Sequence, residues 1–201
     1  MTTIDQHFEE ERFFVELPSP VGPLRVVAHR SAVVGVYHGE HHPPPSPLLL
    51  GRAVREQVGT PEGARQAVVP PGGPFPPAAT ADLLGTAARE LGEYFDGSRL
   101  VFEVPTSLRG TPFQLSVWGA LARIPYGGRR SYRDIAEQLG NPRMGRAIGA
   151  AVRANPLSII VPGHRVVGST GSVVGYAAGP EAKTTLLELE KIVSCGLPLQ
   201  G

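Results

Sequence analysis

Strand-like runs of hydrophobic residues, separated by turns, recur over much of the first forty residues. Apolar runs occupy residues 13–17, 24–28 and 32–37 and are separated by short turns. This spacing predicts an antiparallel meander of three strands. Residues 51–77 are rich in Gly, Pro, Ala and Arg and show little periodicity, so we interpret them as a linker or irregular cover.

The spacing of apolar residues changes to that of a helix after residue 80. Thr80 is a predicted N-cap, and the apolar positions that follow recur at helical spacing until the Asp-Gly pair at residues 96–97. A short strand is expected at residues 100–105. Thr111 and Pro112 then form a cap and first-turn pair that opens a second helix.

Ser131 and Asp134 have the spacing of a capping box and open a short amphipathic helix. Residues 140–142 turn the chain into another helix, and two short helices joined by such a turn predict a helix-turn-helix. The apolar face of the second helix consists of Met144, Ala147, Ile148, Ala151 and Val152. Its other face carries Arg143, Arg146, Gly149, Ala150 and Arg153. Such a small, basic surface suits a groove or a phosphate backbone, and an ordinary solvated face accounts for it equally well.

The β-branched run at residues 159–161 leads into Pro162-Gly163-His164-Arg165 and a valine pair. This pattern predicts a strand that enters and leaves a small polar site. The site has an ionisable ring and a fixed cation but no nucleophile, because Gly163 stands beside His164. The absent nucleophile is the main question about function.

The length and composition of the chain are those of a globular protein, and the predicted elements indicate its fold class. A chain of 201 residues with 41% hydrophobic content can bury its own core. We expect an α+β protein with a small antiparallel β domain at residues 1–79 and a mainly helical, winged-helix-like domain at residues 80–201. No apolar run is long enough for a membrane span or a signal peptide, so a cytoplasmic location is expected. The single cysteine, Cys195, excludes an internal disulfide.

Charge is unevenly distributed although the net charge is only +1. Nine arginines lie between Arg109 and Arg165, against only Asp134 and Glu137. A basic patch of this kind suits a polyanion. His38, His41 and His42 could ligate a metal, but they lead into three prolines, so we predict a solvated loop and no metal site.

Residues 80–191 resemble the O6-alkylguanine-DNA alkyltransferase family, and the N-terminal meander is more weakly similar to its variable first domain. The likeness rests on shared motifs: Gly110-Thr111-Pro112-Phe113-Gln114, Ile124-Pro125-Tyr126-Gly127, Arg146-Ala147-Ile148-Gly149, Arg153-Ala154-Asn155-Pro156, Pro162-Gly163-His164-Arg165, Gly175-Tyr176, Lys183 and Glu190. This family binds duplex DNA that carries an alkylated guanine. The resemblance therefore implies a DNA-repair protein that binds through its helix-turn-helix.

The resemblance assigns DNA contacts to named residues. In the family, a Pro-Cys-His-Arg segment supplies the cysteine that takes the alkyl group from a guanine flipped out of the duplex, since O6 is out of reach inside the stack. Tyr132 would press on the phosphate of the rotated nucleotide, and Arg146 would fill the vacated place in the stack. The remaining DNA contacts would come from Gly149, Ala150, Arg153 and Arg165.

The same resemblance implies the chemistry and the pocket. Asn155 would brace the active-site turn, and His164, relayed toward Glu190, would draw the proton from the thiol. The guanine pocket would be lined by Tyr132, Val174, Tyr176 and Ala177. No cofactor is expected.

Gly163 departs from the family pattern at the position of the nucleophile. Glycine has no side chain that can accept an alkyl group, and Cys195 lies beyond the last predicted helix, so no self-alkylation is expected. Alkyltransferase-like proteins also lack the cysteine but usually carry tryptophan or alanine in its place. They bind O6-alkylguanine lesions, bend the DNA and hand the site to nucleotide excision repair.

Three functions stay open. The first is a non-catalytic, monomeric protein that recognises and flips O6-alkylguanine in double-stranded DNA and passes it to excision-repair proteins. The second is an enzyme that reuses the pocket for a small-molecule substrate through His164 and Glu190. The third is a laboratory Cys-to-Gly variant of an active alkyltransferase.

Overall fold

The computed structural model describes residues 12–54 and 76–197. Its contacts divide the chain into two compact units: Met1–Gly39 with Pro44–Ser107, and Glu40–Pro43 with Leu108–Gly201. This division differs from the expected boundary between residues 79 and 80, because the first long helix packs with the N-terminal sheet. The sequence offers no signal that residues 40–43 group with the second unit.

The first unit is built on a four-stranded sheet with the order β3-β2-β1-β4. Strands β1 (Arg12–Leu17), β2 (Leu24–His29) and β3 (Ala32–His38) pair antiparallel in chain order, which confirms the predicted meander. Alternate residues of β1 are buried, as the two-residue period of a strand requires. After the one-turn helix α2 (Pro47–Leu50), the short strand β4 (Arg52–Ala53) joins β1 in parallel.

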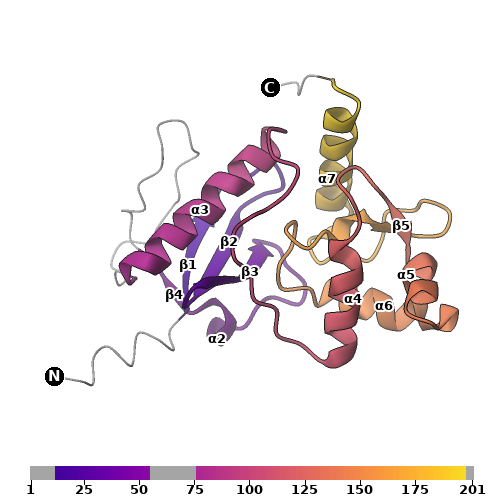
Figure 1. Cartoon of the computed structure of the whole chain (residues 1–201), viewed down its shortest axis with the longest axis horizontal. Coiled ribbons are helices and arrows are strands. Elements are labelled where there is room, and N and C mark those ends of the chain that lie inside the picture. The colour runs from indigo at the N-terminus through magenta and orange to yellow at the C-terminus, as the bar shows by residue number, and fades with distance from the viewer. Residues whose placement is uncertain (1–11, 55–75, 198–201) are drawn as a thin grey trace. The chain divides into compact units, whose positions relative to one another are not determined.

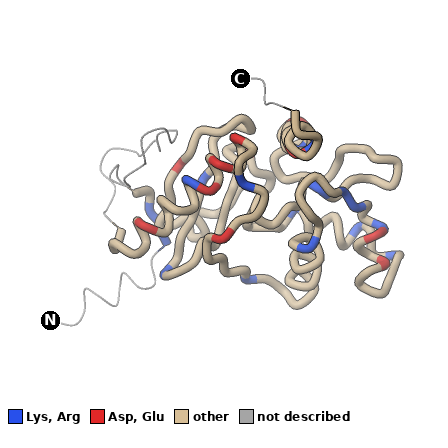
Figure 2. Tube along the Cα trace, turned by 45° about the horizontal axis from the view of Figure 1, so that its top comes forward, with Lys and Arg blue, Asp and Glu red and all other residues tan. Residues whose placement is uncertain are grey.

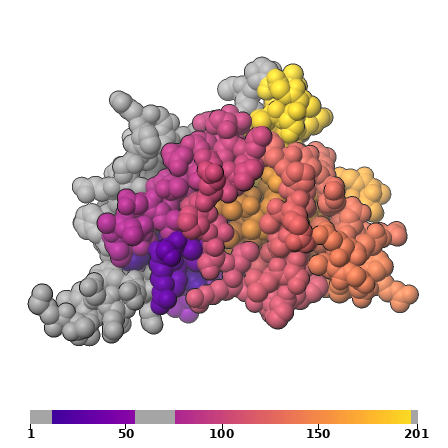
Figure 3. All heavy atoms as spheres, in the orientation of Figure 1, coloured from indigo at the N-terminus to yellow at the C-terminus, as the bar shows by residue number. Residues whose placement is uncertain are grey.

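Helix α3 (Ala78–Phe95) lies across one face of this sheet (Figure 1). In Figure 3 the magenta atoms of α3 hide most of the indigo strands. Its buried residues recur at helical spacing and include Leu84, Ala87 and Leu91. The helix begins at Ala78, so Thr80 is a buried residue of the first turn and the prediction that it caps the helix is wrong.

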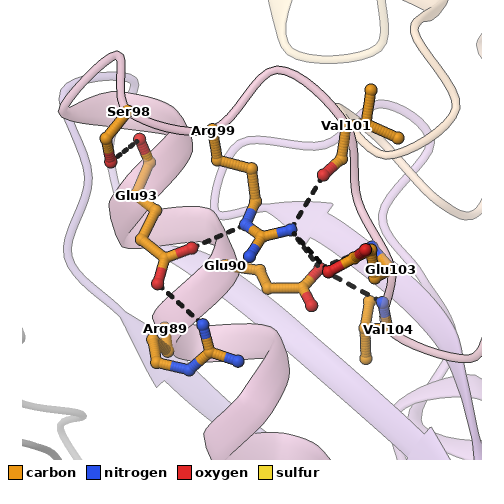
Figure 4. A network of polar contacts seen from close by, with 8 residues as sticks. All are labelled: Arg89, Glu90, Glu93, Ser98, Arg99, Val101, Glu103 and Val104. Carbon is orange, nitrogen blue, oxygen red and sulfur yellow. Dashed lines mark hydrogen bonds and ion pairs between the residues drawn. The ribbon is translucent and has the colours of Figure 1, made fainter.

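The strand predicted at residues 100–105 does not form, because side chains bind its backbone groups (Figure 4). The buried carboxylate of Glu90 accepts the backbone N–H groups of residues 103–104 at 2.9 and 3.1 Å. The guanidinium of Arg99 donates to the carbonyl oxygen of Val101 at 2.9 Å. Backbone groups that are satisfied in this way no longer need a neighbouring strand.

Four longer helices form most of the second unit: α4 (Pro112–Ala122), α5 (Tyr132–Gln138), α6 (Gly145–Arg153) and α7 (Gly179–Ser194). Both predicted N-terminal signals are confirmed, since Thr111 and Ser131 each form a capping box with the residue three positions later. Strands β5 (Arg130–Ser131) and β6 (Val166–Val167) pair in parallel. With the first unit's sheet, these elements confirm the α+β class.

The predicted helix-turn-helix is confirmed by α5 and α6, which pack against each other (Figure 1). The second helix is preceded by one 3-10 turn, η1 (Pro142–Met144), where the Asn141 side chain accepts from the N–H of Arg143. Ile148, Ala151 and Val152 are buried as expected. Ala147 was expected on the same face but is exposed.

Residues 159–161 form a turn, so the strand predicted there is wrong. The N–H of Ile160 donates to Ser158 O at 2.9 Å, and that of Val161 donates to Leu157 O at 2.9 Å. Ile159 has a φ of 72°. This left-handed conformation is rare for a β-branched residue and is incompatible with a strand. Of the two flanks of the polar site, only Val166–Val167 is a strand.

Two further expectations concern regions rather than single residues. Residues 55–75 of the predicted linker lie outside the described residues. Among the helices of residues 12–54 and 76–197, none has the length and apolar character to cross a membrane.

Candidate functional site

Gly163 and His164 lie in a buried 3-10 turn, η2 (Gly163–Arg165), which leads directly into β6. Pro162 precedes the turn and breaks the regular backbone pattern. Because β6 pairs with β5, the turn is fixed next to the start of α5. The polar site predicted from the sequence is therefore held between the helix-turn-helix and the last helix of the unit.

Asn155 holds the chain on the other side of this turn. Its side-chain amide donates to Val161 O at 2.8 Å, and its carbonyl oxygen accepts from the N–H of Leu157 at 3.1 Å. Asn155 is only 3% exposed, so both hydrogen bonds are shielded from water. This geometry fits the bracing role that the resemblance implies for Asn155.

Gly163 is buried, yet the position of a Cβ atom at this residue is not obstructed. Such an atom would lie 3.4 Å from Val152 Cγ1 and 3.7 Å from both Asn155 Nδ2 and Val152 O. These distances are ordinary van der Waals contacts, and the backbone of Gly163 lies outside the left-handed region. The site therefore has room for a small side chain where the chain has none.

Glu190 of α7 is the centre of a buried polar cluster. One of its carboxylate oxygens lies 2.7 Å from His164 Nε2, and Arg165 donates to both oxygens at 2.9 to 3.1 Å. The backbone N–H of Gly127 donates to Oε2 at 3.0 Å, and Arg165 also donates to Ile124 O at 2.6 Å. The exposed fractions of the His164 and Glu190 side chains are 0% and 1%, so water contributes little to this cluster.

The electrostatics of the cluster set its proton positions. Burial lowers the pKa of His164 although the hydrogen bond to Glu190 opposes this shift. Burial alone would raise the pKa of Glu190, but its hydrogen bonds and charge interactions with His164 and Arg165 outweigh burial and lower it. With a neutral histidine, the Arg165 guanidinium is the charge that keeps Glu190 ionised.

An ionised carboxylate can only accept, so Nε2 of His164 carries the ring proton and donates it to Glu190. The other ring nitrogen, Nδ1, then has a free lone pair. It is buried and has no hydrogen-bond partner among the described residues. His164 can therefore act as a proton acceptor through Nδ1.

Three of the four residues expected to line the pocket lie on the loop between β6 and α7, and the fourth, Tyr132, begins α5. Tyr176 is buried, its ring centroid lies 6.3 Å from that of His164, and its hydroxyl is hydrogen-bonded to Ser158. Ala177 is also buried, and its carbonyl oxygen accepts from the N–H of His42 at 2.8 Å. Val174, which was also expected to line the pocket, is 50% exposed.

The contact of His42 was missed from the sequence, which suggested only a solvated loop for this part of the chain. Residues 40–43 pack with the second unit, and His41 is buried. Burial lowers the pKa of His41, and the neighbouring His42 lowers it further. Within the described ranges, no cluster of three or more His, Cys, Asp or Glu side chains could hold a metal ion.

The basic residues of the helix-turn-helix face solvent, and Figure 2 marks basic positions in blue along this unit. Arg146, Ala150 and Arg153 of α6 are exposed. Gly149 lies beside Tyr132, since a Cβ atom there would be 3.8 Å from the Tyr132 ring. Arg165 does not belong to this surface, because it is only 6% exposed and pairs with Glu190.

Two further residues of the site had no assigned role. The guanidinium carbon of Arg165 lies over the ring of Tyr126, 5.5 Å from the centroid of that ring. Burial and the charge of Glu190 raise the pKa of Tyr126 to about 12. Lys183 of α7 is completely buried, with its ammonium bonded to two backbone carbonyls. A lysine at helical spacing from apolar positions gives no sequence signal of such burial.

Comparison with known proteins agrees with this geometry. The family described as "6-O-methylguanine DNA methyltransferase, DNA binding domain" matches residues 112–192. A methylated-DNA–protein-cysteine methyltransferase of Mycobacterium bovis is 40% identical over 175 residues, which are 87% of this chain and 90% of that protein. The chain belongs to the methylated-DNA–protein-cysteine methyltransferase family. The family's matched domain contains α4 to α7 and so includes Gly163, His164 and Glu190.

Other members of the family show the same relationship. The inducible enzyme of Bacillus subtilis is 51% identical over 113 residues, 56% of this chain and 63% of that protein. The chain thus spans slightly less than two thirds of that relative. A crystal structure of Mycobacterium tuberculosis OGT in complex with DNA is 37% identical in sequence and matches with a TM-score of 0.72. The match covers 90% of this chain and 94% of the OGT chain.

Proposed function

We propose that this protein recognises O6-alkylguanine in duplex DNA without accepting the alkyl group. The observation that carries the proposal is Gly163, which stands at the place that the family resemblance assigns to the nucleophilic cysteine. Around it, the Asn155 brace and the His164–Glu190 pair are complete. The site thus has the supporting groups of an alkyl-transfer centre and lacks the atom that would form the new bond.

No other sulfur replaces the missing one. Cys195 is the chain's single cysteine, and it lies exposed at the C-terminal end of α7. The buried cluster around Glu190 is formed with Gly127, His164 and Arg165 and does not include Cys195. Stoichiometric transfer to Cys195 is therefore not part of the proposal.

Binding to DNA would use α6 and the start of α5. The exposed Arg153 supplies charge for phosphates, and Arg146 would fill the place in the stack that the flipped guanine leaves. The small residues Gly149 and Ala150 leave a smooth surface between these two arginines. The Mycobacterium tuberculosis relative was crystallised with DNA, which supports the same partner for this chain. A flipped guanine would enter beside Tyr176 and His164, and the bound lesion would then be passed to excision-repair proteins.

The direct experiment measures affinity and transfer together. Duplexes that carry one O6-methylguanine with a labelled methyl group are compared with the same duplexes carrying guanine, at several salt concentrations. We expect tighter, salt-dependent binding to the lesion duplex and no label on the protein. Equal affinity for the two duplexes at every salt concentration would contradict the proposal.

A second candidate function is a small-molecule enzyme, favoured by the free Nδ1 of His164. A buried neutral histidine that donates to a carboxylate is arranged as a general base, and it acts on whatever reacting group lies near Nδ1. This function predicts turnover of a small molecule that disappears in His164→Ala. Retained lesion preference in His164→Ala, with no turnover by the wild type, would favour the DNA-binding function instead.

A further inference from the structure

Lys183 is buried without a carboxylate partner among the described residues. Its exposed fraction is 0%. The ammonium donates to Val166 O and, at 2.6 Å, to Val174 O, and it lies 5.7 Å from the ring centroid of Tyr132. Two carbonyl dipoles and an aromatic face are the groups that compensate the desolvation of this charge.

These contacts join three elements that are separate in the sequence. Val166 follows the turn that holds Gly163, Val174 lies in the loop before α7, and Tyr132 begins the helix-turn-helix. The Tyr132 hydroxyl also donates to Val174 O, at 2.8 Å. The carbonyl oxygen of Val174 therefore accepts from both Lys183 and Tyr132. We call the set of four residues, Tyr132, Val166, Val174 and Lys183, the Val174 clasp.

Gly175 allows the loop backbone to lie close to the Tyr132 hydroxyl. It has a φ of +71°, and a Cβ atom there would overlap the Tyr132 hydroxyl. The loop backbone can approach Tyr132 only because this residue has no side chain. The loop then continues directly to Tyr176 and Ala177, so the position of the clasp determines where these two buried residues lie.

We propose that Lys183 is a positioning residue for lesion recognition. Lys183 holds the loop of residues 168–178 against Tyr132 and the Gly163 turn, and it thereby sets the shape of the guanine pocket. The inference rests on the proposed function. Binding to undamaged duplex uses the exposed arginines of α6 and does not need the pocket. Loss of the clasp should therefore reduce the preference for the lesion and leave binding to undamaged DNA intact.

Burial lowers the pKa of Lys183 to about 8, so the amine is mostly protonated at neutral pH. The titratable groups with which it interacts are Tyr132 and His164. The chain contains only one other lysine, Lys191, which is exposed on the same helix. Lys191→Met is thus a matched control for Lys183→Met.

The first test measures the affinity of both variants for a duplex with O6-methylguanine and for the same duplex with guanine. A charge-assisted hydrogen bond corresponds to about tenfold or more in affinity. We expect Lys183→Met to lose about tenfold for the lesion duplex and to bind the guanine duplex like the wild type. Lys191→Met should match the wild type on both.

A second pair of variants leaves the buried ammonium in place. Gly175→Ala introduces the overlap with Tyr132, whereas Gly171→Ala places the same methyl at a φ of +82° with no atom within 4 Å. Both substitutions strain the backbone, so the difference between them isolates the clasp. We expect selective loss of lesion affinity in Gly175→Ala alone, and this pair decides the question if Lys183→Met does not fold.

Hydrogen exchange of residues 168–178 without DNA separates this inference from the proposed function. Exchange should be faster in Lys183→Met than in Lys191→Met even if the wild type shows no lesion preference. A wild type without lesion preference overturns the proposed function and the recognition role of Lys183 together. The inference alone is overturned if Lys183→Met and Gly175→Ala both fold and prefer the lesion duplex as strongly as the wild type does. It is also overturned if residues 168–178 exchange no faster in Lys183→Met than in Lys191→Met.

Discussion

Replacing Gly163 by cysteine should restore alkyl acceptance with little cost in stability. The added Cβ would meet its nearest neighbours, in Val152 and Asn155, at 3.4 to 3.7 Å, so the Cβ itself displaces no atom. Removing a glycine also restricts the unfolded chain, which stabilises a protein by about 0.4–1 kcal/mol where the backbone is compatible. We therefore expect the free energy of unfolding of Gly163→Cys to equal that of the wild type or to exceed it by up to about 1 kcal/mol.

The restored thiol would be on the residue that precedes His164 in the chain, and the free Nδ1 of His164 can take its proton. The thiolate sulfur would then form a bond to the alkyl carbon as the bond from that carbon to guanine O6 breaks. The assay is intact-protein mass spectrometry after incubation with a duplex that contains O6-methylguanine. It is done in a Cys195→Ser background, and the expected product carries one methyl group on each protein molecule.

Gly163→Ala is the matched control, because it adds the same Cβ without the sulfur. It should fold, bind the lesion duplex and take up no methyl group. A Gly163→Cys protein that folds and binds the lesion but remains unmethylated would refute the interpretation of His164 and Glu190 as an intact proton relay. A laboratory origin of Gly163 would be supported by rapid, complete methylation and by a cysteine codon in the natural gene.

Three further predictions concern the cluster and the DNA-binding face. In denaturant titrations, Glu190→Gln should lower the free energy of unfolding by about 3–5 kcal/mol, because it leaves the Arg165 guanidinium buried and unpaired. The control Glu188→Gln changes an exposed residue and should alter the free energy of unfolding by less than about 0.5 kcal/mol. Because burial lowers the pKa of His164, its contribution to stability is complete above the unfolded pKa of about 6.5 and is lost as the pH falls below it; His164→Asn should remove that part of the pH dependence of the urea midpoint. Arg153→Ala should reduce the slope of log affinity against log salt by about one in DNA-binding titrations, and an unchanged slope would place Arg153 away from the phosphates.

The sequence is most informative where structure is determined by local chemistry. Two capping boxes, at Thr111 and Ser131, are formed within four residues of the chain, so their spacing is sufficient to predict the starts of α4 and α5. The three-strand meander is likewise predicted by its apolar runs and short turns. These signals gave the α+β class and the helix-turn-helix.

The prediction is less complete where remote side chains replace local partners. Residues 100–105 have strand-like composition, but the carboxylate of Glu90, more than ten positions earlier, binds the backbone that a strand would pair. Residues 159–161 are β-branched and still form a turn, which begins with Ile159 in a left-handed conformation. No local pattern indicates either outcome, because each depends on tertiary contacts that override intrinsic propensity.

Buried charges were the least predictable part of the site. Arg165 was expected at the DNA surface among other arginines, yet its guanidinium is bound by Glu190, 25 positions later. Lys183 was one matching position in a family pattern, and its role in joining Tyr132 to the loop became visible only from three-dimensional contacts. Charged residues are seldom fully buried, so the sequence alone favours the exposed interpretation.

The central claim is that the protein binds the lesion and does not accept the alkyl group. It is tested most directly by mixing the wild-type protein with a duplex that carries one O6-methylguanine with a labelled methyl group, in the presence of excess undamaged duplex. The account predicts a stable complex with the lesion duplex and all of the label still in the DNA. Label on the protein, or displacement of the lesion duplex in proportion to the excess of undamaged duplex, would contradict it.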